Sequence, residues 1–246
     1  MPSAKYAARC AILYVKRGFS EDKRSTLFSI ILSIVLTAAI VPRLAKGISA
    51  IPPQGLTYVG NLYALTFGAT IGFLASVITS GMGSVLYHDK VSRFVEVILS
   101  TPLTPRTYIA SITTASIIHS IASYAIVASV YTAVSATIVS DTAKQVLLNS
   151  WVYIIALLMA ILTSLISVTV NLVAARLSVD PSRLATIPSM AIFLVVIFVI
   201  SALGIKALSS EYLYAFTAAL GMACLALVIA IEALARRLAG EYLITW

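Results

Sequence analysis

Long apolar runs alternate with short polar segments along most of the chain. Runs with almost no charged residues lie at about 26–42, 58–86, 108–139, 151–174, 188–207 and 211–235. A helix needs about 20 apolar residues to cross the roughly 30 Å of hydrocarbon in a bilayer. A helix also satisfies its own backbone hydrogen bonds, which lipid requires. The pattern therefore predicts an all-α, polytopic membrane protein with about six transmembrane helices.

Two of these runs have informative ends. The first run closes with Pro42 and Arg43, where we expect the helix to stop, because proline removes a backbone donor and a charged residue follows. The third run, 108–139, has 32 residues. At a rise of 1.5 Å per residue it would be about 48 Å long. It must therefore tilt, bend or protrude from the bilayer.

The segment before the first run is basic and amphipathic. Lys5, Arg9 and Lys16 recur at helical spacing, and Leu13 and Tyr14 lie toward the opposite face. Such a helix lies flat at a membrane surface. It is either a surface anchor or a collar helix that links the membrane part to a cytoplasmic partner.

Composition supports one membrane domain over 1–246. Of the 246 residues, 60% are hydrophobic and 11% are charged, whereas soluble domains carry about a quarter charged residues. No soluble block separates the runs, so we expect an amphipathic segment at 1–25, six spans within 26–235 and a tail at 236–246.

The basic residues indicate how the chain is oriented. The net charge is +8, and thirteen of the 17 Lys and Arg residues fall on one side of the predicted spans. This bias predicts a multi-pass protein of the cell membrane with both termini in the cytoplasm. The basic residues occupy short connections and form no stripe with stacking aromatics, so we expect no nucleic-acid partner.

The apolar runs contain little chemistry. His119 is the one clear titratable residue in the middle of a run, and Glu232 lies near the end of the last run, within reach of Arg236. Ion-coupled transporters and channels usually need more charged groups than this. The two cysteines and two histidines predict no disulfide and no metal site. No phosphate-binding loop occurs, so we expect neither an enzyme nor a bound cofactor on this chain.

Two sets of small or polar residues lie within the runs. Gly68 and Gly72 are four residues apart, a spacing that lets two helices approach closely, and we interpret them as a packing face. Polar side chains in the third run would line a pathway for an amphiphile, a drug or a lipid-linked saccharide. They are Ser116, His119, Ser120, Ser123 and Tyr124. His119 alternatively forms a hydrogen-bonded helix contact.

The segment 88–106 is the longest charged stretch between runs. Its apolar residues recur at helical spacing, at Val91, Phe94, Val95, Ile98 and Leu99. Its polar side consists of Asp89, Lys90, Arg93 and Glu96. Pro102 prevents the helix from continuing. We therefore expect a short amphipathic helix followed by a rigid turn.

This segment resembles the first cytoplasmic loop of the type-2 family of ABC transporter permeases. That loop reads Glu-x-x-x-Gly-Thr-Leu-Glu-x-Leu-Leu-x-[Ser/Thr]-Pro-[Leu/Val]-Ser. The chain matches it at Glu96, Ile98, Leu99 and Thr101-Pro102-Leu103-Thr104, with Asp89 at a usual acidic position. It departs at Arg93-Phe94, where Gly-Thr is common, and at Ser111 and Ile112, which lie where a basic residue is often found.

The resemblance implies the transmembrane subunit of an ABC exporter. ATP and Mg²⁺ would bind a separate cytoplasmic ATPase, and a second copy or a related permease would complete the pathway. The loop would be a coupling helix that docks on the ATPase. Its contact residues would be Asp89, Arg93, Phe94, Glu96, Ile98, Leu99, Thr101 and Pro102. The alternative is a membrane scaffold or assembly factor that transports nothing and recruits a cytoplasmic protein through the same loop.

Overall fold

The computed structural model describes residues 2–21, 23–52, 55–91, 104–137, 140–177, 190–191, 193–195, 198 and 209–237. Its helices are α1 (Pro2–Glu21), α2 (Lys23–Ser49), α3 (Leu56–Val91), α5 (Pro105–Ala136), α6 (Asp141–Leu147), α7 (Ser150–Leu177) and α9 (Ser210–Arg237). No strand occurs among these residues. The predicted all-α class is confirmed for the described part of the chain.

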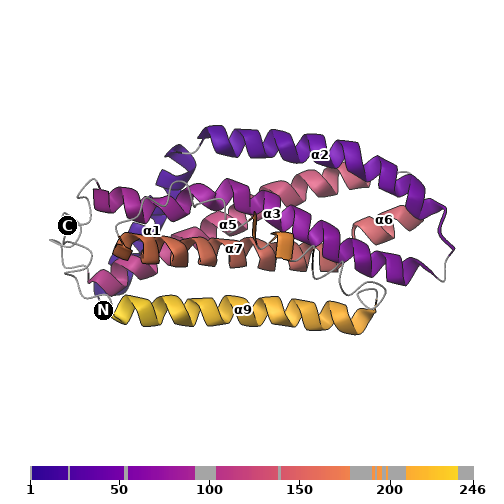
Figure 1. Cartoon of the computed structure of the whole chain (residues 1–246). Helices are drawn as coiled ribbons and strands as arrows, with labels where there is room; N and C mark the ends of the chain where they lie inside the picture. Colours follow the sequence, from indigo (N-terminus) through magenta and orange to yellow (C-terminus); the bar gives the residue numbers. More distant parts are fainter. Residues whose placement is uncertain are drawn as a thin grey trace.

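Three long helices form the centre of a bundle, and two cover it. α3, α5 and α7 run side by side, while α2 and α9 lie on opposite sides of them (Figure 1). The middle of α7 lies inside the bundle, where its residues Ile155, Met159 and Leu165 are fully buried. α2 and α9 expose large apolar side chains, for example Phe28 and Ile229. Faces of this kind are stable against lipid and costly in water.

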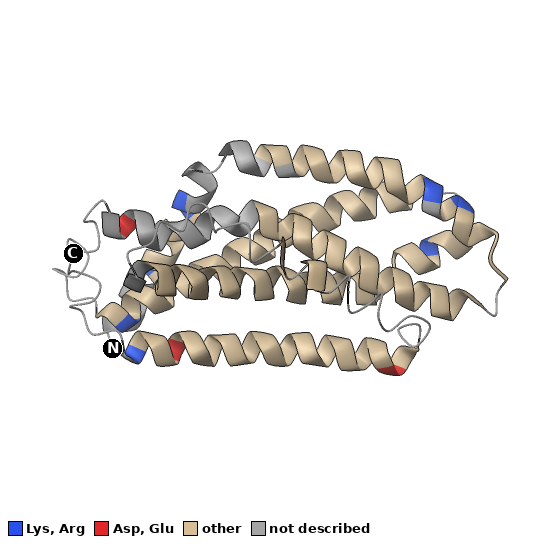
Figure 2. Ribbon diagram, viewed as in Figure 1, with Lys and Arg blue, Asp and Glu red and all other residues tan. Residues whose placement is uncertain are grey.

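The charged residues of the described helices lie at the two ends of the bundle and leave a band without charges between them (Figure 2). Among the described residues, five segments are long and apolar enough to cross a membrane: Ile30–Ser49, Leu56–Val77, Pro105–Ala136, Asp141–Ala174 and Ser210–Arg236. The predicted multi-pass membrane character is therefore supported by the structure. Most of the predicted run 188–207 lies outside the described residues. Within it, Phe193 stacks on Phe73 of α3 with ring centroids 4.7 Å apart.

The expected stop at Pro42 is wrong. α2 passes through this proline and ends at Ser49, seven residues later. In an apolar environment an open backbone has no water to satisfy it, so a helix tolerates one missing donor better than it tolerates ending. Val41 and Ile48 are fully buried on either side of Pro42. Their packing against the bundle stabilises the continued helix.

The third predicted run forms one continuous helix, α5, which begins at Pro105, three residues before the expected start. After α5 comes α6, a two-turn helix that the apolar pattern did not reveal. Ser140 caps it by accepting a hydrogen bond from the amide of Ala143 at 3.4 Å. The hydroxyl of Tyr131 on α5 donates to the carbonyl of Leu147 at 2.6 Å and holds α6 against the bundle.

The N-terminal segment is helical, as predicted. α1 lies at the end of the bundle where α3 ends and α5 begins (Figure 1). Ala11 and Tyr14 are buried against the other helices, while Leu13 is 65% exposed. Of the two residues expected on the apolar face, Tyr14 therefore packs inside the chain and Leu13 lies on its outer surface.

Candidate functional site

The predicted coupling segment is described at its two ends. Asp89 lies in the last turn of α3, and Thr104 immediately precedes α5. The other residues of the predicted contact set lie outside the described residues. They are Arg93, Phe94, Glu96, Ile98, Leu99, Thr101 and Pro102. The candidate site therefore consists of the contacts that fix the end of α3 and the start of α5, on either side of residues 92–103.

The first end is held by a buried carboxylate. Asp89 has no exposed surface. It accepts hydrogen bonds from the hydroxyls of Tyr14 at 2.7 Å and Tyr108 at 2.9 Å. The guanidinium of Arg17 forms an ion pair with its other oxygen, at 2.5 Å. We call these four residues the Asp89 cluster. A buried charge is tolerated only when it is paired and hydrogen-bonded, and this cluster meets both conditions.

The Asp89 cluster joins three helices. Tyr14 and Arg17 come from α1, Asp89 from the end of α3 and Tyr108 from the start of α5. The rings of Tyr14 and Tyr108 also pack edge to face, with centroids 6.1 Å apart. Burial, and then the charge and hydrogen bond of Asp89, raise the pKa of the Tyr14 hydroxyl above its ordinary value. The hydroxyl therefore stays protonated and donates to the carboxylate.

This position of Asp89 differs from the sequence interpretation. The helical pattern placed Asp89 on the polar side of a surface helix, where a partner could reach it. In the structure it is fully buried among side chains of the same chain. Its partners Tyr14 and Tyr108 lie 75 and 19 residues away. No local pattern in the sequence identifies a contact of that kind.

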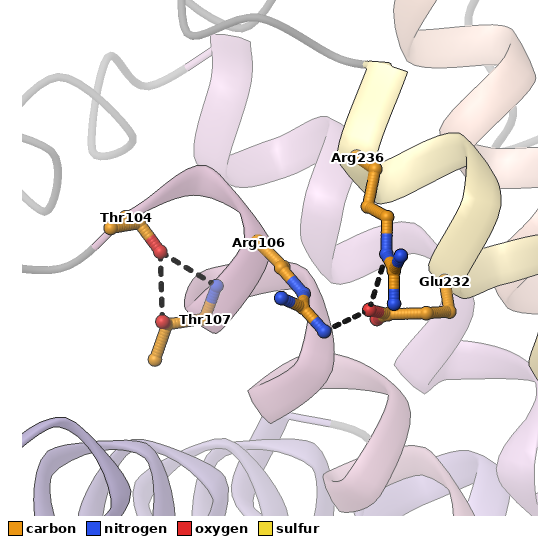
Figure 3. Close-up of polar contacts among 5 residues, drawn as sticks. All are labelled: Thr104, Arg106, Thr107, Glu232 and Arg236. Atoms are coloured by element: carbon orange, nitrogen blue, oxygen red, sulfur yellow. Dashed lines mark hydrogen bonds and ion pairs between the residues drawn. The ribbon is translucent and has the colours of Figure 1, made fainter. Parts of the chain in front are cut away.

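The second end is held by a helix cap and an ion-pair network (Figure 3). The hydroxyl oxygen of Thr104 accepts from the amide of Thr107 at 3.2 Å, and Pro105 occupies the first turn. Both features favour a helix start at this point. Glu232 on α9 pairs with Arg106 on α5, and also with Arg236 at 3.1 Å. The predicted Glu232–Arg236 contact is confirmed, and Arg106 connects it to α5.

The two predicted packing glycines face α7. A Cβ atom on Gly68 would lie 2.8 Å from the Cβ of Ile155. One on Gly72 would lie 2.9 Å from the carbonyl oxygen of Ala156. Only a residue without a side chain allows α3 and α7 to approach this closely. Within this chain, the glycine face is therefore occupied by α7.

The predicted pathway residues lie inside the bundle. Ser116, His119, Ser120 and Ser123 are each at most 1% exposed, and Tyr124 is half-buried. The hydroxyls of Ser116 and Ser164 on α7 lie 2.7 Å apart and share a hydrogen bond. α7 adds further buried polar residues, and we call the combined set the polar seam. It consists of Ser116, His119, Ser120 and Ser123 on α5 with Ser164, Ser167 and Asn171 on α7.

Sequence reasoning missed the α7 half of the polar seam. Ser164, Ser167 and Asn171 recur at spacings of three and four, which places them on one helix face. That periodicity was visible in the sequence. Within the described segments, the hydroxyls of Ser120, Ser123 and Ser167 have no hydrogen-bond partner. Polar groups buried in this way favour any rearrangement that brings water or a polar ligand to them.

The described side chains offer binding and packing chemistry. Between residues 2 and 237, the described positions contain no group of three or more His, Cys, Asp or Glu residues that could hold a metal ion. The polar seam presents hydroxyls, one imidazole and one amide. Such groups can donate and accept hydrogen bonds along a path through the bundle.

Comparisons with known proteins identify no relative: no protein-family model, no curated protein and no solved structure matches the chain. The resemblance to type-2 permeases therefore rests on the loop residues and the order of spans. It stays a prediction from the sequence.

Proposed function

We propose that this chain is the transmembrane subunit of an ABC exporter of the type-2 kind. In this proposal it sits in the cell membrane with both termini in the cytoplasm, and a separate ATPase subunit binds and hydrolyses ATP with Mg²⁺. A second copy of the chain, or a related permease, completes the transporter. The chain itself contributes the pathway and the loop on which the ATPase acts.

The observation that carries the proposal is the anchoring of both ends of the segment 92–103. Asp89 joins the end of α3 to α1 and to α5, and Arg106 joins the start of α5 to α9. A loop that only rests on lipid needs no such connections. A loop that receives force from a partner needs them, because force passes only through elements that move as a rigid body.

The mechanism follows from these connections. ATP binding closes the ATPase pair and displaces the docked loop. The ends of α3 and α5 follow, which changes the balance between inward-open and outward-open arrangements. Separation of α5 from α7 breaks the hydrogen bond between Ser116 and Ser164. The polar seam and Tyr124 then face an open path.

The composition of the seam limits the cargo class. Hydroxyls and one imidazole suit a molecule that carries both polar and apolar groups, such as an amphiphile, a drug or a lipid-linked saccharide. The seam contains no charged side chain. A strongly charged solute would therefore find no counter-charge among the seam residues, and its desolvation would be costly.

The first experiment is co-purification. The tagged chain is extracted from its native membrane in mild detergent, and mass spectrometry identifies the proteins that accompany it. Recovery of a Walker-motif ATPase in stoichiometric amount would support the proposal. A chain that comes out alone, under conditions that preserve other complexes, would contradict it and favour the scaffold function.

A charge reversal in the loop sharpens the experiment. Glu96→Lys should weaken ATPase recovery, because it reverses a charge within the predicted contact surface. Glu211→Lys is the matched control, since Glu211 lies in the first turn of α9, at the opposite end of the bundle. If the ATPase co-purifies equally well with both variants, Glu96 does not contribute to its binding.

A further inference from the structure

The Asp89 cluster connects a helix at the end of the bundle to both ends of the same loop. α1 lies along the first turns of α5, where Tyr108 and Ile109 are each 1% exposed. Asp89 lies three residues before the segment 92–103, and Tyr108 lies five residues after it. One carboxylate at the end of α3 thus contacts both α1 and the start of α5.

We infer that Asp89 is a positioning residue that binds α1, the end of α3 and the start of α5 into a single rigid unit, so that α1 moves whenever these two helix ends move. This inference rests on the proposed function for its moving part, because the proposed ATPase drives the loop. The existence of the unit itself depends only on this chain. α1 then takes part in transmitting the movement from the ATPase to the spans and is more than a surface anchor.

The chemistry of the cluster favours a unit that stays together. Asp89 is fully buried, while the side chain of Arg17 is 33% exposed. Pulling α1 away would leave the carboxylate without the Tyr14 hydroxyl and without its cation. A buried charge that loses its partner is strongly destabilised, and hydrogen bonds to charged groups are among the stronger ones in proteins. The contact therefore resists separation more than an ordinary apolar contact does.

The first arm of the test measures whether α1 is held, in the isolated chain. The full chain is placed in lipid nanodiscs, and hydrogen–deuterium exchange is followed for the amides of residues 8–17. Asp89→Asn keeps the side-chain shape but removes the charge and turns an amide donor toward the cluster. We expect α1 to exchange at least about tenfold faster in this variant, while α3 and α7 keep their protection.

Tyrosine variants separate the cluster from general damage. Tyr108→Phe removes one hydroxyl that donates to Asp89. Tyr131→Phe removes an equally buried hydroxyl at the other end of α5, which donates to Leu147. We expect faster exchange of α1 in Tyr108→Phe and no change there in Tyr131→Phe. Exchange of α1 within twofold of the wild type in both Asp89→Asn and Tyr108→Phe would overturn the rigid unit.

The second arm asks whether α1 moves with the loop. Cys10 and Cys224 are first replaced by serine. Spin labels are then placed at Ile12, which is 64% exposed on α1, and at Val173, which is 43% exposed on α7. A second pair uses Thr114, an exposed residue of α5, with Val173, because the proposed movement separates α5 from α7. Distances are measured with the co-purified ATPase, before and after addition of ATP and vanadate.

The two distances separate this inference from the proposed function. In the wild type both distances should change together, and in Asp89→Asn only the Thr114–Val173 distance should change. If both pairs still shift in Asp89→Asn, α1 follows the loop by another route and the inference fails, while the proposed function stands. If neither pair shifts in the wild type, ATP does not drive the loop and the proposed function fails with it.

Discussion

Gly72 lies so close to α7 that a Cβ atom at this position would be 2.5 Å from the Cβ of Met159. Real Cβ atoms do not approach one another that closely, so a side chain on Gly72 would force α3 and α7 apart. The neighbouring atoms include the backbone of Ala156, which cannot rotate away. The contact between these helices, and with it the centre of the bundle, depends on the absence of one methyl group.

Gly72→Ala should therefore destabilise the protein by about 1–3 kcal/mol, the usual cost of overpacking. The matched control is Gly221→Ala on α9, where an added Cβ would meet nothing within 4 Å. Alanine is the better helix former, so this control should stabilise the helix by up to about 1 kcal/mol. Unfolding of the detergent-solubilised protein, followed by circular dichroism, measures both. Similar shifts for the two variants would contradict the close contact.

The membrane class could be predicted from the sequence because the hydropathy of each run is summed over many residues. Each apolar run contributes about 20 consecutive positions, and one unusual residue does not change the result. Pro42 shows the limit of such reasoning at a boundary, since α2 continues past it to Ser49. Propensity describes one residue, whereas the burial of Val41 and Ile48 depends on helices elsewhere in the chain.

The candidate site was less predictable than the fold. The spacing of Gly68 and Gly72 indicated a packing face, but the sequence could not show that α7 is the helix packed against it. The Asp89 cluster was missed altogether, because Tyr14 and Asp89 are 75 residues apart. Local periodicity reports which face of a helix is buried. It does not report which distant side chain is found there.

The hydrogen bond between Ser116 and Ser164 gives a second prediction. Because their hydroxyl oxygens lie 2.7 Å apart, cysteines at these positions should form a disulfide on mild oxidation in membranes, after replacement of Cys10 and Cys224. The control pair combines Ser164→Cys with Ser129→Cys, which is exposed on the same helix as Ser116. The first pair should cross-link and the second should not. Equal yields would show that α5 and α7 do not meet at the polar seam.

If the seam opens during transport, the same disulfide has a functional consequence. A link between α5 and α7 should abolish transport, and reduction should restore it. ATP binding to the partner should be unaffected, because the seam lies within the apolar middle of the bundle. Full transport by the oxidised pair would contradict a pathway between these helices.

The third prediction concerns the end of α5 that carries α6. Tyr131→Phe removes the donor to the carbonyl of Leu147 and leaves that acceptor buried. A buried acceptor without a partner costs about 1–3 kcal/mol. We expect faster hydrogen exchange in α6 and in the first turn of α7. Tyr153→Phe is the control, because its hydroxyl meets Thr132 on an exposed surface. A larger effect of Tyr153→Phe would contradict the assignment.

The last prediction tests the ion pair that joins α5 to α9. Glu232→Lys would face the guanidinium groups of Arg106 and Arg236 with a third positive charge, so the start of α5 should move away from the end of α9. Combining it with Arg106→Glu restores opposite charges across the two helices and should restore their separation. Spin labels at Ala110 and Ala233, both exposed, report the distance.

Salt separates this electrostatic effect from a change in packing. The pair is partly exposed, with side-chain exposures of 57% for Arg106 and 34% for Glu232. Interactions of that kind weaken strongly at 1 M salt, where the screening length is about 3 Å. The distribution of label-to-label distances in the wild type should therefore broaden at high salt, whereas the distribution in Glu232→Gln should not change with salt. If the double charge exchange fails to restore the wild-type distance, packing alone positions α9, and the ion pair does not hold the start of α5 in place.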